Sequence, residues 1–358
     1  MVCLALPNSR ASAANCTDRQ EVSRLAGSMI IAGFFGTRVS DTGFQRTLAD
    51  LEEGLIGGVL VLGRNVGERT DLEEMVRRFS TCKCSTPPFI AIDEEGGSIE
   101  RLGANLGLEE TPSATAVAQG SVAAAHKTYG ALARKLASFR FNTNLGPVVD
   151  LNRNPQNPII GRLHRSYGDE TGIVVKYASI FIQEHHKKRI ITVLKHFPGH
   201  GSSSADSHDR LADITTSWST NELKPFKHLI RSGLADAIMV GHLANSTKWG
   251  GAATQSGSNA ISRMLREELQ YQGVVITDDL AMRAISDERK TVPDAAVDAI
   301  LAGADVVLVG RMNDEDQASD VGREVNRTLT ARACTNEISI EDLEKSSRRI
   351  QRLKSRWR

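Results

Sequence analysis

Aromatic residues and long apolar runs are both scarce in this chain. Phe, Trp and Tyr make up 5% of its 358 residues, which disfavours an aromatic-rich β-sandwich and favours close-packed strands and helices built from smaller apolar side chains. No stretch approaches the roughly 20 consecutive apolar residues that a membrane-spanning helix needs. The sequence therefore predicts a large folded core and no membrane span.

The chain also lacks an excess of either charge, because its formal net charge is +1 at pH 7. Such a balance creates no overall field to attract nucleic acid or an anionic membrane, and we expect neither as a partner. The local basic run from Lys345 to Arg358 is typical of a solvated helix face. We expect a monomer that acts on a small molecule.

Cysteine is infrequent, and its five positions are Cys3, Cys16, Cys82, Cys84 and Cys334. Residues 1–20 are either a disordered leader or the remnant of a signal peptide, and without Cys3 an even number remains, which is compatible with disulfides. An exported, disulfide-bonded protein and a cytoplasmic protein with free thiols both fit this pattern. The Cys82-Lys83-Cys84 spacing is too tight for a zinc knuckle, and we expect no metal there.

Short β-branched runs alternate with longer segments of helical period, which is typical of repeated βα units around a parallel sheet. Strands are expected over residues 29–34, 58–62, 89–92, 142–149, 191–196, 237–241, 274–277 and 305–309. Helices are expected over residues 43–55, 72–79, 114–138, 172–186, 222–232, 259–272 and 294–302, with two more after the last strand. The final helix opens with Ser339 three residues before Asp342 and should pack on the outside of the barrel.

Eight alternating units predict one α/β domain, a (β/α)8 TIM barrel over residues 21–358 with extra C-terminal helices. A doubly wound open sheet is the alternative architecture. It would bring a glycine-rich first turn at a helix N-terminus, and the residues from Gly33 to Gly36 do not match that fingerprint. The chain has no Pro-, Gly- or Ser-rich linker long enough to divide it.

Reactive polar residues follow six of the predicted strands, at the barrel end where active sites form. They are Arg64, Asn65, Asp93, Glu94, Glu95, Asp150, Lys195, His196, His242, Asp278 and Asp279. Any one of them alone is more simply explained as a helix cap or a loop hydrogen bond. Their recurrence on six strands favours an active site.

Residues 195–208, KHFPGHGSSSADSH, form the richest of these segments. Lys195 and His196 should point into the mouth of the barrel, while the following prolines and glycines predict a polar, flexible loop that can act as a lid. Asp206 and His208 share one face of an extended stretch, so the carboxylate can orient the imidazole and raise its basicity. A solvated turn is the simpler explanation of these residues taken alone.

The seventh strand ends abruptly in two carboxylates. Strand alternation favours Asp278 pointing into the mouth and Asp279 capping or orienting its neighbours. An ionised carboxylate held near an anomeric carbon is what a double-displacement glycosidase requires, because it must attack an oxocarbenium-like centre and later leave.

These segments resemble the single-domain bacterial β-N-acetylglucosaminidases of glycoside hydrolase family 3, from residues 27–34 through 303–309. The specific signatures are the lysine-histidine segment ending in residues 206–208 and the strand ending in residues 277–280. The resemblance implies a retaining enzyme with Asp278 as nucleophile, His208 as acid/base and Asp206 as its partner. It further implies residues that hold a terminal N-acetylglucosamine, namely Asp93, Arg101, Arg165, Lys195 and His196.

The sequence differs from the family pattern at two places, and neither difference falls on these residues. The usual Asp-Gln-Glu-Gly-Gly-Arg is DEEGGS over residues 93–98, and Ser202-Ser203-Ser204-Ala205 stands where an Asp-Thr pair is common. They put in doubt the group bound beyond the first sugar and the mobility of the loop. The resemblance implies a substrate derived from peptidoglycan or a chitooligosaccharide, with no cofactor.

Three other functions remain as alternatives. A metal-dependent barrel hydrolase would use His196, His200, His208, His242 and Asp278 as ligands, although Lys195 would repel a divalent ion. A sugar-binding protein without catalysis would not need all three catalytic residue types. A β-glucosidase or β-xylosidase of the same family generally takes its acid/base from an additional domain, which this chain is too short to contain.

Overall fold

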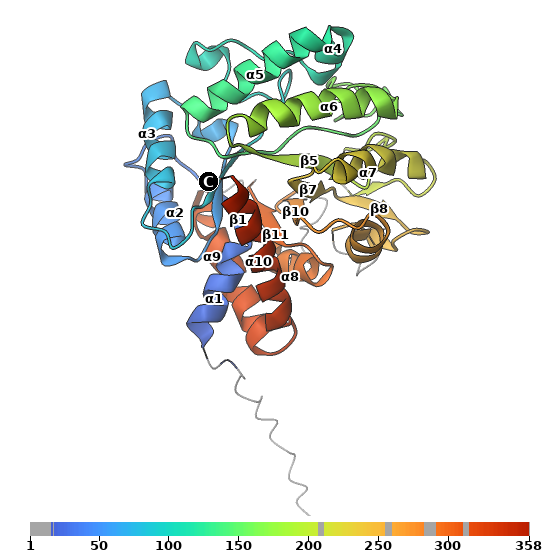
Figure 1. Ribbon diagram of the computed structural model, residues 1–358. Helices are drawn as coiled ribbons and strands as arrows, with labels where there is room; N and C mark the ends of the chain where they lie inside the picture. The colour runs from blue at the N-terminus through green and yellow to red at the C-terminus, as the bar shows by residue number, and fades with distance from the viewer. Residues whose placement is uncertain are drawn as a thin grey trace, which may run out of the picture.

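Eight parallel strands close into a barrel in the computed structural model, which describes residues 16, 18–206, 211–254, 260–282, 291–310 and 315–357, without the side chains of 315–319 (Figure 1). The strands follow one another around the barrel in the order β1-β11-β10-β7-β5-β4-β3-β2. Their bounds are β1 Ile30–Gly33, β2 Gly58–Val61, β3 Phe89–Ile92, β4 Thr143–Asn144, β5 Ile191–Phe197, β7 Ala237–Val240, β10 Val274–Asp279 and β11 Val306–Val309. The predicted (β/α)8 barrel is confirmed, and the open sheet is excluded.

Helices pack around the barrel and over one of its ends (Figure 1). They are α1 Arg19–Ser28, α2 Thr42–Glu53, α3 Arg69–Ser80, α4 Ala114–Gln119, α5 Val122–Ser138, α6 Thr171–His186, α7 Lys224–Arg231, α8 Val292–Leu301, α9 Glu315–Cys334 and α10 Ile340–Arg356. Short helical turns are η1 Gly63–Asn65, η2 Ala104–Leu106 and η3 Thr220–Leu223, and η5 Ala260–Glu268 is a π-helix. Within the described ranges, no helix combines the length and apolarity that crossing a membrane demands.

Two predicted elements differ from the structure for local reasons. The predicted helix over 114–138 is two helices, because α4 ends at Gly120 and the Ser121 side chain caps a new N-terminus at Ala124 N. The predicted strand over 142–149 is a regular strand only at Thr143 and Asn144, with an isolated bridge between Val148 and Lys195 further on. Pro147 follows closely, and it has no N–H with which to extend a ladder.

A small second sheet stands beside the barrel mouth. Its strands are β6 Ala212–Asp213, β8 Leu243–Asn245 and β9 Gly251–Ala252, in the order β6-β8-β9. Because β6 pairs with β8, the chain that leaves β5 returns to a fixed position after residue 211. This sheet was not predicted from the sequence.

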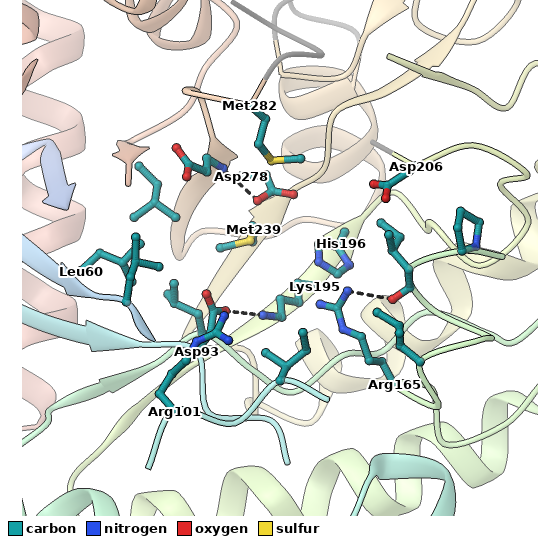
Figure 2. Close-up of a pocket in the computed structure, with 18 residues that line it drawn as sticks. Leu60, Asp93, Arg101, Arg165, Lys195, His196, Asp206, Met239, Asp278 and Met282 are labelled. Carbon is teal, nitrogen blue, oxygen red and sulfur yellow. Dashed lines mark hydrogen bonds and ion pairs between the residues drawn. The ribbon is translucent and has the colours of Figure 1, made fainter. Parts of the chain in front are cut away.

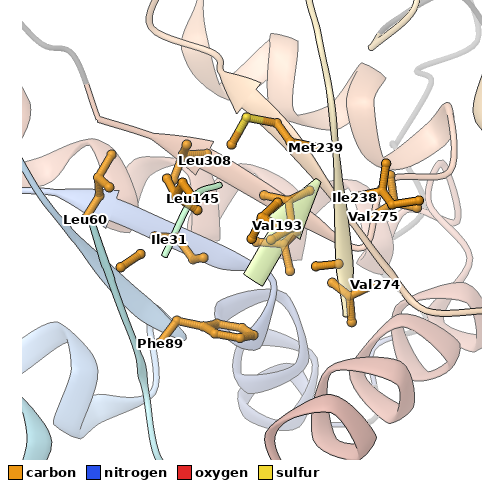
Figure 3. Packing of buried hydrophobic residues seen from close by; sticks show 14 of the residues in the cluster. Ile31, Leu60, Phe89, Leu145, Val193, Ile238, Met239, Val274, Val275 and Leu308 are labelled. Atoms are coloured by element: carbon orange, nitrogen blue, oxygen red, sulfur yellow. The ribbon is translucent and has the colours of Figure 1, made fainter. Parts of the chain in front are cut away.

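Apolar side chains fill the interior of the barrel (Figure 3). Ile31, Leu60, Val193 and Leu308 come from four different strands and are all buried. Their packing makes the interior a solid core rather than a channel, as in other eight-stranded barrels of this kind. The polar residues at the strand ends therefore stand on a rigid floor.

The last helix, α10, covers the N-terminal ends of the strands. Lys354 Nζ donates to the carbonyl of Gly57, just before β2, and Ser346 Oγ donates to Asp305, just before β11. The predicted cap is confirmed, since Ser339 Oγ accepts a hydrogen bond from Asp342 N. On the face of α10 toward the barrel, Leu343, Ile350 and Leu353 are buried. The helix thus closes the barrel end opposite the reactive residues.

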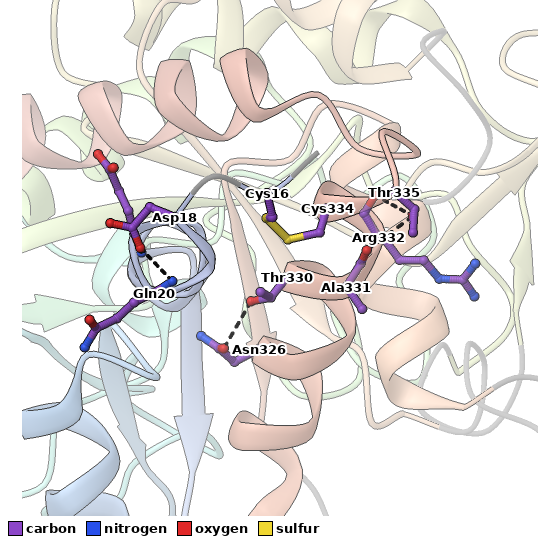
Figure 4. The surroundings of a disulfide bond; sticks show 10 residues. Cys16, Asp18, Gln20, Asn326, Thr330, Ala331, Arg332, Cys334 and Thr335 are labelled. Atoms are coloured by element: carbon purple, nitrogen blue, oxygen red, sulfur yellow. Dashed lines mark hydrogen bonds between the residues drawn. A yellow bond between two sulfur atoms is a disulfide. The ribbon is translucent and has the colours of Figure 1, made fainter. Parts of the chain in front are cut away.

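Two disulfides join the four cysteines that the structure describes, and Figure 4 shows the one between Cys16 and Cys334. Cys16 pairs with Cys334 at the end of α9, and Cys82 pairs with Cys84. Helix α1 is also tied to α9 by Asn326 Nδ2, which donates to the carbonyl of Ser23. Because α1 begins at Arg19, the predicted domain boundary at residue 21 cuts through this helix.

Candidate active site

A cavity of about 370 Å³ opens where the barrel strands end (Figure 2). Its apolar walls include Leu60, Leu62, Ile99, Leu145, Ile159, Met239, Met282 and Leu308. A volume near the lower end of the range for small-molecule sites suits a ligand of modest size. The C-terminal face is also where the active sites of (β/α)8 barrels lie.

Seven of the eight site residues expected from the sequence line this one cavity. They are Asp93, Arg101, Arg165, Lys195, His196, Asp206 and Asp278. The eighth, His208, lies outside the described residues. In Figure 2, Asp278 and Asp206 are seen above His196, and Asp93, Lys195 and Arg165 below it. The tertiary structure thus brings together residues separated by up to 185 positions in the chain.

Two cations and two carboxylates form a buried network on one side of the cavity. Lys195 Nζ lies 2.7 Å from Asp93 Oδ1 and 2.6 Å from Glu95 Oε1. Arg165 binds both oxygens of Glu95 through Nε and Nη2, each at 2.8 Å. A bidentate pair of this kind is geometrically specific. Glu95 therefore fixes the side chains of both Lys195 and Arg165.

The charges of this network hold Glu95, Arg165 and Lys195 ionised. Burial alone would raise the pKa of Glu95, but Arg165 and Lys195 outweigh it and hold the pKa well below its usual range. Burial would likewise lower the pKa of Lys195, and the charges of Asp93 and Glu95 raise it instead. The site keeps a fixed ammonium and a fixed guanidinium ready to donate hydrogen bonds.

Arg101 reaches the cavity from the loop that follows β3. Its backbone N donates to Glu94 Oε2 at 2.6 Å, and its buried Nε has no partner among the described residues. Glu94 is completely buried, and burial raises its pKa although Lys135 lies 3.1 Å away. Glu94 stands where the family pattern has glutamine, and Lys135 behind the loop lies close to its carboxyl. The Arg101 guanidinium faces the cavity.

Asp150 organises the two histidines of the fifth strand and the turn after it. Its Oδ2 lies 2.7 Å from His196 Nδ1, and its Oδ1 accepts the backbone N–H of His200 at 2.8 Å. Burial would raise the pKa of Asp150, but His196 and the His200 amide lower it. Burial and the neighbouring His196 lower the pKa of His200 to about 4, so its ring is neutral at pH 7.

The two carboxylates that end β10 have separate surroundings. Asp278 Oδ1 accepts the backbone N–H of Asp279 at 2.8 Å, and Asp278 lines the cavity (Figure 2). Asp279 Oδ1 accepts the backbone N–H groups of Ala281 and Gly310. The expectation that Asp279 orients its neighbours is confirmed, although part of it also lines the cavity.

The segment that leads to Asp206 is partly different from the flexible loop expected from the sequence. Residues 198–203 are all buried, and exposure begins at Ser204. Asn157 Nδ2 donates to the carbonyl of His200, and Asn154 N donates to the carbonyl of Gly201. The prediction was wrong for this half because glycines and serines can also pack tightly when side chains elsewhere satisfy their backbone groups.

The structure argues against the metal-site alternative. His242 Nδ1 lies 3.1 Å from Thr254 Oγ1, and His242 Nε2 lies 2.9 Å from the carbonyl of Asp279, so both ring nitrogens are engaged. His196 Nδ1 is taken by Asp150. Among the described residues there is no group of three His, Cys, Asp or Glu side chains arranged to hold a metal ion.

Glu95 and Asp150 are the residues whose importance sequence reasoning missed. Both were noted as polar residues after strands, but neither was assigned to the site. The signal was their position at strand ends, which they share with Asp93 and Glu94. Only the fold reveals that Glu95 bridges two cations and that Asp150 binds His196.

The comparisons with known proteins agree in one family. Residues 38–353 match the model of the glycosyl hydrolase family 3 N terminal domain. The β-hexosaminidase A of Pseudoalteromonas piscicida is 30% identical over 324 residues, which cover 84% of this chain and 53% of that protein. The β-hexosaminidase of Photobacterium profundum is 29% identical over 321 residues, which cover 86% of this chain and 93% of that protein.

A solved structure supports the same relationship. The family 3 β-N-acetylglucosaminidase from Paenibacillus sp. str. FPU-7 superposes with a TM-score of 0.83 at 30% sequence identity, over 93% of this chain and 62% of that one. The chain therefore spans just over half the length of some relatives and nearly all of another. With a family match over most of its residues, this chain belongs to glycosyl hydrolase family 3, to whose N-terminal barrel domain it corresponds.

Proposed function

We propose that this chain is a retaining exo-β-N-acetylglucosaminidase, with residues 21–358 acting as one catalytic domain. The observation that carries the proposal is the single cavity lined by Asp278, Asp206 and the Asp93-Lys195 pair. The names of the relatives, β-hexosaminidase and β-N-acetylglucosaminidase, support the choice of sugar. The enzyme would act without a metal or cofactor.

Asp278 is the proposed nucleophile. Its carboxylate attacks the anomeric carbon of the bound sugar while the bond from that carbon to the leaving oxygen breaks, which yields a covalent glycosyl-aspartate. The hydrogen bond from Asp279 N to Asp278 Oδ1 supports this role, because it holds one oxygen and directs the other toward the ligand. The carboxylate leaves when water later attacks the same carbon.

His208 is the proposed acid/base, oriented by Asp206. It gives a proton to the departing oxygen in the first step and takes a proton from the attacking water in the second. Asp206 lines the cavity and lies two positions before His208 in the sequence, which supports this assignment. A carboxylate at one imidazole nitrogen would keep the other nitrogen in the correct protonation state.

The remaining site residues bind the terminal sugar ring in this proposal. Asp93 accepts from its hydroxyls, while Lys195, Arg101 and Arg165 donate to them, so that the ring is held in one orientation before attack. His196 offers Nε2, because Asp150 takes Nδ1. An arrangement of fixed acceptors and donors suits vicinal hydroxyls better than a charged or apolar ligand.

The natural substrate would carry a terminal N-acetylglucosamine on a peptidoglycan fragment, an anhydromuropeptide or a chitooligosaccharide. Incubating the enzyme with each of these and measuring the N-acetylglucosamine released would rank them. Nitrophenyl β-glucoside and β-xyloside, compared with nitrophenyl β-N-acetylglucosaminide, would test the choice of sugar. Preference for either of the first two would overturn the assignment.

A covalent trap tests the mechanism. A 5-fluoro N-acetylglucosaminyl fluoride should inactivate the enzyme as each enzyme molecule releases one fluoride ion from the reagent. The sugar should then label the peptide that contains Asp278. Asp278→Asn should take up no label. A label on another residue, or proton NMR that shows the inverted anomer as the first product, would overturn the proposal.

A further inference from the structure

Glu222, in η3, lies behind the segment that delivers Asp206 to the cavity. It has no exposed surface, and its Oε2 accepts the backbone N–H of Ser202 at 3.3 Å. Gly199 passes so close that a Cβ there would stand 2.5 Å from the Cβ of Glu222. The backbone at Gly199 has φ +121°, a conformation that side-chain-bearing residues rarely adopt. Glu222 thus contacts both ends of the turn from Gly199 to Ser202.

The carboxyl of Glu222 is not explained as a stabilising group. Its Oε1 is buried and has no hydrogen-bond partner among the described residues, so its environment satisfies the group only in part. Burying an ionisable group without a full set of partners costs stability. An acceptor for the backbone N–H of Ser202, which holds the turn in place, accounts for a polar side chain at this position.

The same turn is held from its other side by residues that follow β4. Asp150 accepts the N–H of His200, and Asn154 N donates to the carbonyl of Gly201. Asn154 Nδ2 also donates to the carbonyl of Ser203, three residues before Asp206. The turn is therefore clamped between the β4 loop and Glu222. A shift at the Glu222 side would tilt the turn and move Asp206.

We propose that Glu222 is a positioning residue for the glycosidase reaction, which holds the turn from Gly199 to Ser203 and thereby sets where Asp206 stands at the cavity. The kinetic part of this inference rests on the proposed function. In this chain the contact at Ser202 is with a backbone N–H, which either a carboxyl or an amide oxygen can accept. Glutamine at 222 should therefore substitute for glutamate, and alanine should not.

The electrostatic surroundings of Glu222 favour the neutral form of its carboxyl. Burial, together with the negative charge of Asp150 in the loop after β4, raises the pKa of Glu222 to about 7. The Ser202 contacts oppose this shift only in part. The neutral form of the carboxyl can accept the Ser202 N–H. A glutamine amide is also neutral, which supports the expectation that it can replace Glu222.

Hydrogen exchange tests the positioning without any use of activity. In Glu222→Ala, backbone amides of residues 199–203 should exchange at least about tenfold faster than in the wild type, because their turn loses one wall. Glu222→Gln should stay within about threefold of the wild type. Asp50→Asn is the matched control, since Asp50 is also a buried carboxyl with a raised pKa but lies in α2. Unchanged exchange at 199–203 in the alanine variant would overturn the inference.

A leaving-group comparison tests the consequence for the reaction. A phenyl N-acetylglucosaminide needs acid assistance and a dinitrophenyl one does not. Glu222→Ala should lower kcat/KM for the phenyl substrate at least about tenfold more than for the dinitrophenyl substrate, and Glu222→Gln should restore the wild-type ratio. Equal losses on both substrates would mark Glu222 as merely structural and overturn the inference.

Two further outcomes keep the test decisive. Should the alanine variant fail to fold, Glu222→Asp takes its place, because the shorter side chain withdraws the carboxyl from Ser202 while keeping a carboxyl at this position. An aspartate variant that matches the wild type in both measurements would contradict the inference. A wild-type enzyme that hydrolyses neither substrate would overturn the proposed function instead, and the exchange result would still decide the positioning.

Discussion

Asp150 binds His196 twice, through the ring Nδ1 at 2.7 Å and through the backbone N–H at 3.1 Å. One carboxylate therefore fixes both the backbone and the ring of a residue that lines the cavity. Asp150→Asn should lower kcat/KM on a nitrophenyl N-acetylglucosaminide by about 10- to 100-fold, because a neutral amide holds the imidazole and the His200 turn less firmly. Asp71→Asn, on the surface of α3, should have no effect, and an unchanged rate for Asp150→Asn would contradict the positioning role.

Variants of the proposed nucleophile and of the proposed acid/base should differ in how their rates depend on the leaving group. Asp278→Ala should reduce turnover by at least about 10³-fold while binding of N-acetylglucosamine stays largely intact, since the hydroxyl-binding residues are untouched. His208→Ala should harm substrates with poor leaving groups most, by about 10²- to 10⁴-fold. Steady-state rates and product binding by calorimetry check both. Equal loss across good and poor leaving groups in His208→Ala would count against its acid role.

Glu95 should matter for stability as much as for binding. Glu95→Gln leaves Lys195 and Arg165 buried without their shared carboxylate, which should destabilise the protein by about 3–5 kcal/mol. The pKa of Glu95 is lower in the folded protein than in the unfolded chain. The stabilisation that Glu95 provides is therefore complete at pH values above its unfolded pKa and is lost as pH falls toward its folded pKa. Denaturant unfolding at pH 7 and pH 4 should show wild type weakening on acidification more than Glu95→Gln does.

Glu222 should have the opposite pH dependence. The pKa of Glu222 is about 7 in the folded protein, above its unfolded value of about 4.5, so the folded state binds this proton more tightly than the unfolded state does. The free energy of unfolding therefore falls as pH rises from about 4.5 through about 7. The charged group that faces it is Asp150, itself bonded to His196 and His200. Glu222→Gln should remove up to about 3 kcal/mol of this loss. Parallel stability curves for the two proteins between pH 5 and pH 8 would exclude the effect.

The two disulfides should contribute unequally. The Cys16–Cys334 bond closes a loop of sequence separation 318, and the Cys82–Cys84 bond one of separation 2. Loop-closure entropy therefore predicts a loss of up to about 5 kcal/mol for the double serine variant of the first pair and roughly 1–2 kcal/mol for the second. Melting temperatures of both variants measure this contrast. A larger effect from the second pair would refute the entropic explanation.

Local pattern was enough to predict most of the architecture. All eight predicted strands occur, because β-branched runs that are buried on both faces are distinct from the helical segments between them. Boundaries were wrong where a single residue interrupts a pattern, as at Gly120 between α4 and α5. Helix α1 was missed because its short amphipathic segment follows a stretch without any periodicity, and its docking on α9 depends on distant contacts such as that of Asn326.

The sequence by itself determined the barrel and the kinds of chemistry at its mouth, since strand periodicity and the polar residue that ends each strand are local properties. Only the tertiary structure decided which carboxylates serve which partners. Glu95 and Asp150 acquire their roles from Arg165 and His196, 70 and 46 positions away, because charge pairing and burial depend on distance in space. The same reason makes Glu222 visible only when η3 is packed against the turn that carries Ser202.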